Sequence, residues 1–270
     1  MSENSVGREG SADTVRLLSL NIQVGLNSSR YWHYLTHAWR HVLPTRSAQL
    51  NLDRIAKLVS RYDIVALQEA DAGSLRTSQL NQVAHLAERA GFPYWHSAVT
   101  RDLRPFAQHC LGCLSRWPLE NVKYHALPGW LPGRGALEVE VQPEGREPLR
   151  LFIVHLALGR RVRKQQLHFI STLIHDRIDT IVLGDLNCDE SELTIHDGLR
   201  NAGLRGVHKN HTFPSWRPSR ALDHILVTPT VEVLTATVLE ERLSDHLPVA
   251  TEIRLRLETD DRKAARSNNA

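Results

Sequence analysis

Short apolar runs typical of β-strands recur along this chain of 270 residues, and polar side chains stand at or just past their ends. The clearest run is Thr180–Leu183, which Gly184 breaks and which Asp185 and Asn187 follow, one residue apart. Residues two apart in a strand point to the same face, so a strand carried through Asn187 would direct both side chains into one space. A carboxylate beside an amide suits a hard cation, a phosphate or both. The pair also fits a turn that caps the following helix, so this run alone leaves both interpretations open.

The order of the runs along the chain predicts the fold class. Strand-like runs alternate with amphipathic helical runs in two successive rounds, and each round ends in strands that look antiparallel. Two sheets packed face to face, with helices outside, fit this order better than one continuous parallel sheet. The expected strands span residues 15–22, 62–68, 110–116, 121–127, 135–141, 149–156, 180–183, 222–227, 231–239 and 249–255, and the expected helices span residues 47–60, 80–90, 160–175 and roughly 190–201.

Length and composition indicate one globular domain. Hydrophobic residues make up 41% of the sequence and charged residues 23%, as in ordinary soluble proteins. No linker, repeat or low-complexity block interrupts the middle of the sequence, so we expect a single domain over residues 14–257, with disordered tails at 1–13 and 258–270. The formal net charge of +3, from 33 basic and 30 acidic residues, neither demands nor excludes a polyanionic partner such as nucleic acid.

Cysteine use and hydropathy bear on the cellular compartment. The three cysteines do not form a disulfide framework. Cys110 and Cys113 have CxxC spacing, but no second pair of metal ligands stands near them, so we interpret them as small apolar residues of a strand. The start, MSENSVGREGSADT, lacks the apolar core of a signal peptide. No run approaches the ~18 apolar residues of a transmembrane segment, so we expect a reducing, cytoplasmic location.

Polar side chains at the ends of six strand-like runs predict a shared functional cleft. They are Asn21, Glu69, His155, Asp185 with Asn187, Asp223, and Asp245 with His246. Carboxylates, amides and imidazoles at the ends of apolar strands are costly to bury unless they meet one another or a cation. One such residue would be ordinary, but six strands with the same feature indicate that these ends meet at one edge of a sandwich.

The residue types in this set suit a divalent cation. Glu69 and Asp245 can hold the cation through their carboxylates. Further oxygen ligands can come from Asn21, Asp185 and Asn187. A site rich in oxygens and poor in histidines favours Mg²⁺ or Mn²⁺ over zinc.

The histidines of the set can move protons. A histidine beside a carboxylate can act as general base toward water. Asp223 is the candidate to orient His246, as a third group orients the base in other hydrolases. A bound cation would polarise the phosphoryl oxygen and offset charge at the leaving oxygen. Together these residues predict metal-dependent hydrolysis of a phosphate ester.

Seven motifs occur in a fixed order across residues 15–255: SLNIQ, ALQE, GCLSRWPL, VHL, GDLN, LDHILV and SDHLPV. In this arrangement the chain resembles the endonuclease/exonuclease/phosphatase superfamily, whose members include deoxyribonucleases, neutral sphingomyelinases and inositol-polyphosphate phosphatases. GDLN and SDHLPV are the specific motifs of the series. The resemblance implies an α/β fold, a four-layered α/β sandwich of two mixed, mainly antiparallel β-sheets packed face to face with helices outside. It also implies metal-dependent cleavage of phosphate esters, with Glu69 as the principal metal ligand, helped by Asn21 and Asp245.

The same resemblance implies roles for the remaining members of the set. Asp185 and Asn187 would position or activate the attacking water and hold the phosphate. His246 would pair with Asp223. His155 would contact the scissile phosphate and is the candidate to protonate the leaving group, although the residue before it departs from the threonine that is common in the family.

Residues outside this set are candidates for substrate contact. Arg76, Asn81 and Arg134 are expected in loops, where they could hold a phosphate. In the segment Tyr31–His41, aromatic residues alternate with basic ones, which suits stacking on bases or covering a lipid headgroup and equally suits a packed surface helix. The basic run Arg160–Lys164 could steer a polyanion, and a solvated helix face is the competing interpretation.

The motifs favour a phosphodiesterase or nuclease. His155 stands where abasic-site endonucleases of the superfamily carry a Tyr-x-Pro-Asn stretch, and the Pro-x-Trp-x-Asp-Arg stretch of inositol phosphatases is matched poorly around Trp216. The sequence contains no long apolar loop of the kind that a sphingomyelinase would insert into a membrane. The alternatives are a phosphomonoesterase or a phospholipase C-type enzyme acting on inositol phosphates or lipid headgroups. A non-catalytic binding module on the same fold would be expected to have lost one or more of Glu69, Asp185 and His246, all of which are present.

Overall fold

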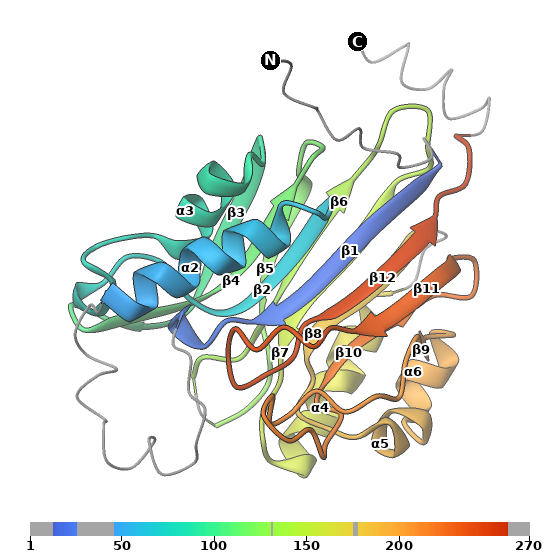
Figure 1. The fold of residues 1–270 in the computed structure, drawn as a ribbon. Coiled ribbons are helices and arrows are strands. Elements are labelled where there is room, and N and C mark those ends of the chain that lie inside the picture. The colour runs from blue at the N-terminus through green and yellow to red at the C-terminus, as the bar shows by residue number, and fades with distance from the viewer. Residues whose placement is uncertain (1–12, 26–45, 131, 175–177, 259–270) are drawn as a thin grey trace, which may run out of the picture.

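A computed structural model of the chain describes residues 13–25, 46–130, 132–174 and 178–258 (Figure 1). The aromatic and basic segment Tyr31–His41 lies outside these residues, as do nearly all of the two expected tails. None of the described helices combines the length and the apolar character that a membrane crossing requires.

The described strands form two six-stranded sheets. The first has the order β11 (Glu232–Val238), β12 (Val249–Arg254), β1 (Thr14–Asn21), β2 (Ile64–Asp71), β4 (Ala107–Ser115), β3 (Tyr94–Leu103). The second has the order β5 (Glu120–Ala126), β6 (Gly135–Val141), β7 (Leu149–His155), β8 (Asp179–Asp185), β10 (Asp223–Val227), β9 (Arg205–Gly206). In each sheet one pair is parallel, β1 with β2 and β7 with β8, and the other described pairs are antiparallel.

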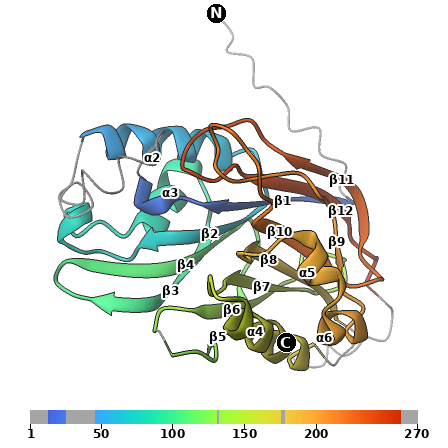
Figure 2. The ribbon, with the colours of Figure 1, turned by 90° about the horizontal axis from the view of Figure 1, so that it is seen from below.

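Helices cover the outer face of each sheet (Figure 2). The first sheet is covered by α2 (Arg46–Val59) and α3 (Gln82–Ala90), and the second by α4 (Arg160–Thr172), α5 (Glu190–Thr194) and α6 (Asp197–Asn201). Short 3₁₀ turns, η1 (Gln23–Gly25) and η3 (Leu75–Thr77), follow β1 and β2. The layers therefore run helix, sheet, sheet, helix, which confirms the predicted four-layered sandwich of mixed sheets.

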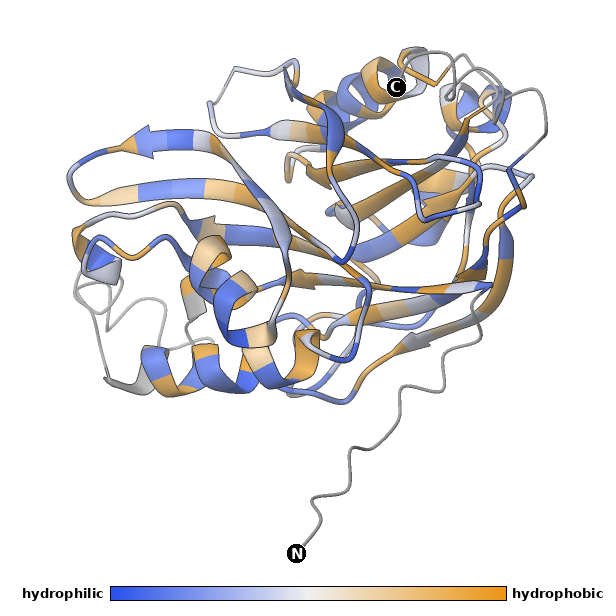
Figure 3. Ribbon diagram, turned by 90° about the horizontal axis from the view of Figure 1, so that it is seen from above, coloured by the Kyte–Doolittle hydropathy of each residue, from blue (hydrophilic) through white to orange (hydrophobic). Residues whose placement is uncertain are grey.

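Alternating burial along the strands explains why two cores form. On β7, Leu151 and Ile153 pack between the two sheets, whereas Phe152 and Val154 pack toward the helices of the second layer. Leu167, on α4, meets this outer face. The helices contribute one apolar stripe each, and the mixed hydrophobic and hydrophilic bands along α2 in Figure 3 show this amphipathic character.

Three elements differ from the sequence-based expectation, and one of them is the two-residue edge strand β9, which no apolar run marks. Strand β3 was not expected, because it is the edge strand of its sheet and most of its residues are exposed, so it lacks an apolar run. The helix expected at roughly 190–201 is two short helices, α5 and α6, separated around Ile195 and His196. Cys110 and Cys113 lie buried in β4, as the interpretation of them as apolar strand residues requires.

Candidate active site

Strand register brings the predicted polar residues to one edge of the sandwich. The parallel pair β7–β8 places His155 opposite Asp185, and the antiparallel pair β8–β10 places Asp185 opposite Asp223. In the other sheet, the parallel pair β1–β2 carries Asn21 and Glu69 to the carboxyl ends of their strands. The two sheets are in direct contact here, where Asn21 Nδ2 donates a hydrogen bond to Asp185 Oδ2 over 3.2 Å. The cluster is thus assembled from both sheets.

Glu69 owes its direction to a break in the regular strand. The register between β2 and β4 shifts between Leu67 and Ala70, which is the signature of a β-bulge. Glu69 has a φ of 54°, a left-handed conformation that non-glycine residues rarely adopt and that costs of order 1–3 kcal/mol. Its Oε1 lies 3.7 Å from His155 Nε2. The bulge therefore re-aims a carboxylate from sheet one toward the strand ends of sheet two.

The Gly-Asp-Leu-Asn stretch forms a strand end followed by a turn. Gly184 has a φ of 145°, and a Cβ at this position would lie 2.0 Å from the carbonyl oxygen of Val154. The strand ends at Asp185, and Asn187 has a φ of 53°. Asn187 donates its backbone N–H to Asp185 Oδ1 at 3.0 Å and its Nδ2 to the carbonyl of Leu156 at 2.9 Å. Strand geometry does not continue through Asn187, and the pair combines the strand-end and turn interpretations.

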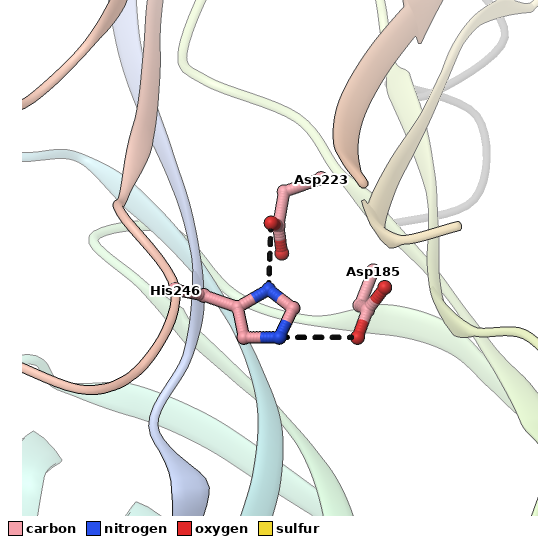
Figure 4. Close-up of side chains that lie close together, drawn as sticks. All are labelled: Asp185, Asp223 and His246. Carbon is pink, nitrogen blue, oxygen red and sulfur yellow. Dashed lines mark hydrogen bonds and ion pairs between the residues drawn. The ribbon is translucent and has the colours of Figure 1, made fainter. Parts of the chain in front are cut away.

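Asp223 and His246 form a buried pair. His246 Nδ1 lies 2.7 Å from Asp223 Oδ2, and both side chains are less than a tenth exposed. His246 Nε2 faces Asp185 Oδ2 at 3.9 Å, so that the ring stands between two carboxylates (Figure 4). Burial disfavours the imidazolium, but Asp223 and Asp185 outweigh it and raise the pKa of His246 to about 10.

Asp185 is the centre of the cluster. Its Oδ2 lies 3.5 Å from His155 Nε2, in addition to the contacts with Asn21 and His246. Burial is the main cause that raises the pKa of Asp185 to about 7; the Asp223 and Glu69 carboxylates add to it and His246 opposes it. Burial also lowers the pKa of His155 well below 6.5, assisted by the positive charge of Arg134. Asp185 is therefore poised to exchange a proton near neutral pH, and His155 is neutral there.

Carboxylate and amide oxygens in the cluster fit a hard divalent cation. Burial raises the pKa of Glu69, and the nearby Asp245 carboxylate raises it further, so two like charges face each other. A cation held between Glu69 and Asp245 would remove this repulsion, and the oxygen donors suit Mg²⁺ or Mn²⁺. Asp185, Asp223 and His246 form a second group that could bind a metal, since one ligand atom from each lies within 4.8 Å of the others.

An open pocket lies beside Glu69 and His155. Arg134 lines it, together with residues from β3 and β4. Of the other two expected substrate contacts, Arg76 donates its Nε to Asp71 Oδ2 at 2.5 Å, and its side chain is 8% exposed. Asn81 caps α3, accepting hydrogen bonds from the backbone N–H groups of two residues of its first turn. The structure brings Arg134 to the cluster and engages Arg76 and Asn81 in internal contacts elsewhere.

Two buried hydroxyl groups that the sequence did not single out hold the cluster in place. Thr212 Oγ1 donates to Asp223 Oδ2 at 2.6 Å. Ser244 Oγ donates to the carbonyl of Asn21 at 2.6 Å and accepts from the backbone N–H of His246 at 3.1 Å. Ser244 directly precedes the Asp-His motif, which is a usable sequence signal; Thr212 stands 11 residues before Asp223 and is recognisable only in three dimensions.

Comparison with known proteins agrees with this geometry. A sequence profile described as the Endonuclease/Exonuclease/phosphatase family matches residues 18–246. No curated protein matches the chain.

Solved structures share the fold at low sequence identity. An endonuclease/exonuclease/phosphatase from Beutenbergia cavernae DSM 12333 has a TM-score of 0.72 at 21% identity, covering 90% of this chain and 72% of that one. A mannosyl-6-phosphatase from Bacteroides thetaiotaomicron VPI-5482 has a TM-score of 0.67 at 18% identity, covering 88% and 99%. ANGEL2, described as a 2′,3′-cyclic phosphatase, has a TM-score of 0.66 at 15% identity, covering 91% and 96%.

Proposed function

Because this chain belongs to the endonuclease/exonuclease/phosphatase family, we propose that it hydrolyses phosphate esters with a divalent metal and acts as a phosphodiesterase or nuclease. The observation that carries the proposal is the buried series Asp223–His246–Asp185, with distances of 2.7 Å and 3.9 Å, beside the carboxylates of Glu69 and Asp245. A binding module would not need a poised proton acceptor at the end of such a series. Nucleic acid is one substrate class that this proposal includes.

The side chains divide the work as follows. Asp223 accepts a hydrogen bond from Nδ1 of the His246 imidazolium, which leaves the Nε2–H directed at Asp185 and the space beside it. Asp185 has a pKa of about 7 and can take a proton from water at Oδ2. The positive charges of His246 and Arg134 stabilise the negative charge that develops on the phosphoryl oxygens.

A metal would be held by Glu69 and Asp245, with Asn21 as an additional oxygen ligand. When bound, it would supply Lewis-acid polarisation of a phosphoryl oxygen and neutralise charge at the leaving oxygen. The donor set supports Mg²⁺ or Mn²⁺ rather than zinc, because oxygen donors prevail over histidine and thiolate.

A phosphomonoesterase is the second candidate. It is favoured by the structural likeness to a protein described as a mannosyl-6-phosphatase and by the arginine-lined pocket beside the cluster, since a monoester dianion needs more positive charge than a diester. A phospholipase C-type activity on inositol phosphates or lipid headgroups stands third.

The test compares p-nitrophenyl phosphate with bis-p-nitrophenyl phosphate in the presence of Mg²⁺ or Mn²⁺. We expect the diester to be hydrolysed and EDTA to abolish turnover, which added metal then restores. Preference for the monoester would select the second candidate, and turnover that survives EDTA would reject the metal-dependent reaction altogether.

A further inference from the structure

The pocket beside the cluster has an inner and an outer part. It is open to solvent and has a volume of about 190 Å³, below the roughly 300–1,000 Å³ typical of sites that enclose a drug-sized ligand. Glu69 and His155 line the inner part and belong to the cluster. The outer part is lined by Arg101 and His109, on β3 and β4, and by Arg134, just before β6. The chemistry described above does not use Arg101 or His109.

A β-bulge shapes the outer part. The register of β3 with β4 runs from Val99 opposite Cys110 to Arg101 opposite His109, so that Thr100 is an extra residue. In a regular strand, Thr100 and Arg101 would point to opposite faces, but both line the pocket. Thr100 Oγ1 donates to the carbonyl oxygen of His109 at 3.2 Å, which fixes the bulge against β4.

Arg101 and Arg134 line the same pocket, and the charge of Arg101 acts on Arg134. Within the ranges that the structure describes, neither guanidinium forms a hydrogen bond or ion pair with a protein group, whereas Arg104 on the same hairpin is paired with Asp102. Gly133 packs on the stem of Arg101, since a Cβ there would lie 3.0 Å from Arg101 Cβ. Two unpaired cations in a partly buried pocket repel each other unless an anion lies between them.

Burial and neighbouring charges shift the pKa values of Arg134 and His109. Burial lowers the pKa of Arg134 and Arg101 adds to this, whereas Asp185 and Glu69 oppose it. The positive charge of Arg134 therefore interacts both with the acidic cluster and with Arg101. Burial lowers the pKa of His109 to about 4, and the guanidinium groups around it act in the same direction. His109 is neutral at pH 7 and can donate or accept a hydrogen bond.

We propose that Arg101 and Arg134, with His109, bind a second anionic group of the substrate, a phosphate that is not cleaved, next to the phosphate ester held at the cluster. The proposal rests on the proposed phosphoester hydrolysis and names its substrate class: phosphate esters that carry a further phosphate a few bonds from the scissile one. A guanidinium pair suits this group, because arginine forms paired, charge-assisted hydrogen bonds with phosphate oxygens.

The test uses p-nitrophenyl phosphodiesters that differ by a single phosphate. Each alkyl ester (ethyl, propyl or butyl) is compared with its ω-phosphorylated counterpart, so that the spacer varies. Free Mg²⁺ or Mn²⁺ is kept constant and in excess, and release of p-nitrophenolate is followed. We expect the phosphorylated ester of the best spacer length to have a kcat/KM at least about tenfold above that of its plain counterpart.

Variants assign this preference to the pocket. Arg101→Gln should lose most of the preference, with a much larger fall on the phosphorylated ester than on the plain one, and Arg101→Lys should keep part of it. Arg104→Gln removes the same charge from the same hairpin, at a side chain that is 68% exposed and does not line the pocket, and should retain the wild-type preference.

The outcomes separate the two proposals. If wild-type enzyme cleaves the plain and the phosphorylated esters equally well, or if Arg101→Gln slows both by the same factor, the second-anion site is wrong while phosphoester hydrolysis stands. If no ester is cleaved with either metal, the proposed phosphodiesterase activity itself is wrong.

Discussion

Thr212 and Asp223 fix the ring of His246 at one position, between two carboxylates. The Nδ1···Oδ2 distance to Asp223 is 2.7 Å, and Asp223 in turn accepts the hydroxyl hydrogen of Thr212. His246→Ala should therefore lower kcat by at least ~10²-fold, because it removes the positive charge beside Asp185 that stabilises the phosphoryl oxygens. The assay is metal-supplemented hydrolysis of bis-p-nitrophenyl phosphate. His211→Ala removes an exposed histidine of the same region and should leave kcat unchanged; an equally active His246→Ala enzyme would exclude His246 from the reaction.

The pKa values of His246 and His155 should be shifted in opposite directions from that of an ordinary histidine. The Asp223 and Asp185 carboxylates, against the effect of burial, raise the pKa of His246 to about 10, whereas burial lowers that of His155 well below 6.5. At pH 8 in metal-free protein, we expect NMR ring signals of a protonated His246 and a neutral His155, assigned with His→Gln variants. Titration of both rings near pH 6.5 would contradict this.

The raised pKa of His246 also makes the stability of the fold depend on pH. Its folded-state pKa, about 10, exceeds the ordinary value of 6.5. Protonation of this ring therefore stabilises the fold fully below about pH 6.5, and the contribution is lost as the pH rises through about 10. Asp223→Asn should reduce this loss, measured as the change in free energy of unfolding of metal-free protein between pH 7 and pH 10. A variant with the wild-type pH dependence would show that Asp223 does not set the pKa.

Single residues were predictable where a strand end carried them. Asn21, Glu69, His155, Asp185 and Asp223 follow from apolar runs that end in polar side chains, and register then brings them together. For Arg76 and Asn81, the sequence indicates only a loop. Their partners, the buried carboxylate of Asp71 and the first turn of α3, are visible only once the chain is folded. The contact of Thr212 with Asp223 is likewise visible only in the folded chain.

At the scale of elements, the β7–β8 pair depends on Gly184. An added Cβ would lie 2.0 Å from the carbonyl oxygen of Val154, and a φ of 145° is strained for any other residue. Gly184→Ala should lower the free energy of unfolding by about 2–4 kcal/mol, measured by urea denaturation. A Cβ at Gly206, in β9 of the same sheet, would lie no closer than 3.8 Å to Leu226 and 3.9 Å to the carbonyl oxygen of His208, so Gly206→Ala should change the free energy of unfolding by about 0.5 kcal/mol or less. Equal effects of the two variants would show that the close approach is tolerated.

Elements were predictable from the sequence to the extent that they bury an apolar face. Strands β6, β7 and β8 are almost wholly buried, and their sequences are mostly apolar. The edge strand β3 buries little beyond Ala98, so no alternation marks it. The bulges at Glu69 and Thr100 also have no signal in apolar periodicity, because they arise from pairing with β4. Both bulges nonetheless aim side chains at the site.

At the scale of the molecule, the site joins the two sheets. Asn21 and Glu69 belong to the first sheet, whereas His155, Asp185 and Asp223 belong to the second. The four layers were predictable because the order of strands and helices repeats in two rounds. Which residues meet across the sheets was not, since no local pattern encodes the contact between Asn21 and Asp185. A ligand at this junction must stabilise the whole domain, because it binds only when both sheets are in place.

The free energy of unfolding should therefore depend on bound metal. The order of stability between wild type and Glu69→Gln should reverse when metal is added. Burial and the Asp245 carboxylate raise the pKa of Glu69, so its ionised form opposes folding at neutral pH when no metal is bound. Glu69→Gln should then be at least as stable as wild type in EDTA. Metal at 100 times its Kd should add about 2.7 kcal/mol to the unfolding free energy of the wild type and much less to that of the variant. Thermal unfolding in EDTA and in MnCl₂ measures both effects.

Glu88→Gln provides the matched control for this reversal. It removes one exposed carboxylate from α3, and its unfolding should follow the wild type in both conditions. A reversed order of stability between EDTA and MnCl₂ distinguishes a metal ligand from a carboxylate that merely supports the fold. A structural Glu69 would make the glutamine variant less stable than wild type both with and without metal. An equal gain from Mn²⁺ in wild type and Glu69→Gln would instead place the cation on other residues, and the group formed by Asp185, Asp223 and His246 would become the metal site to test.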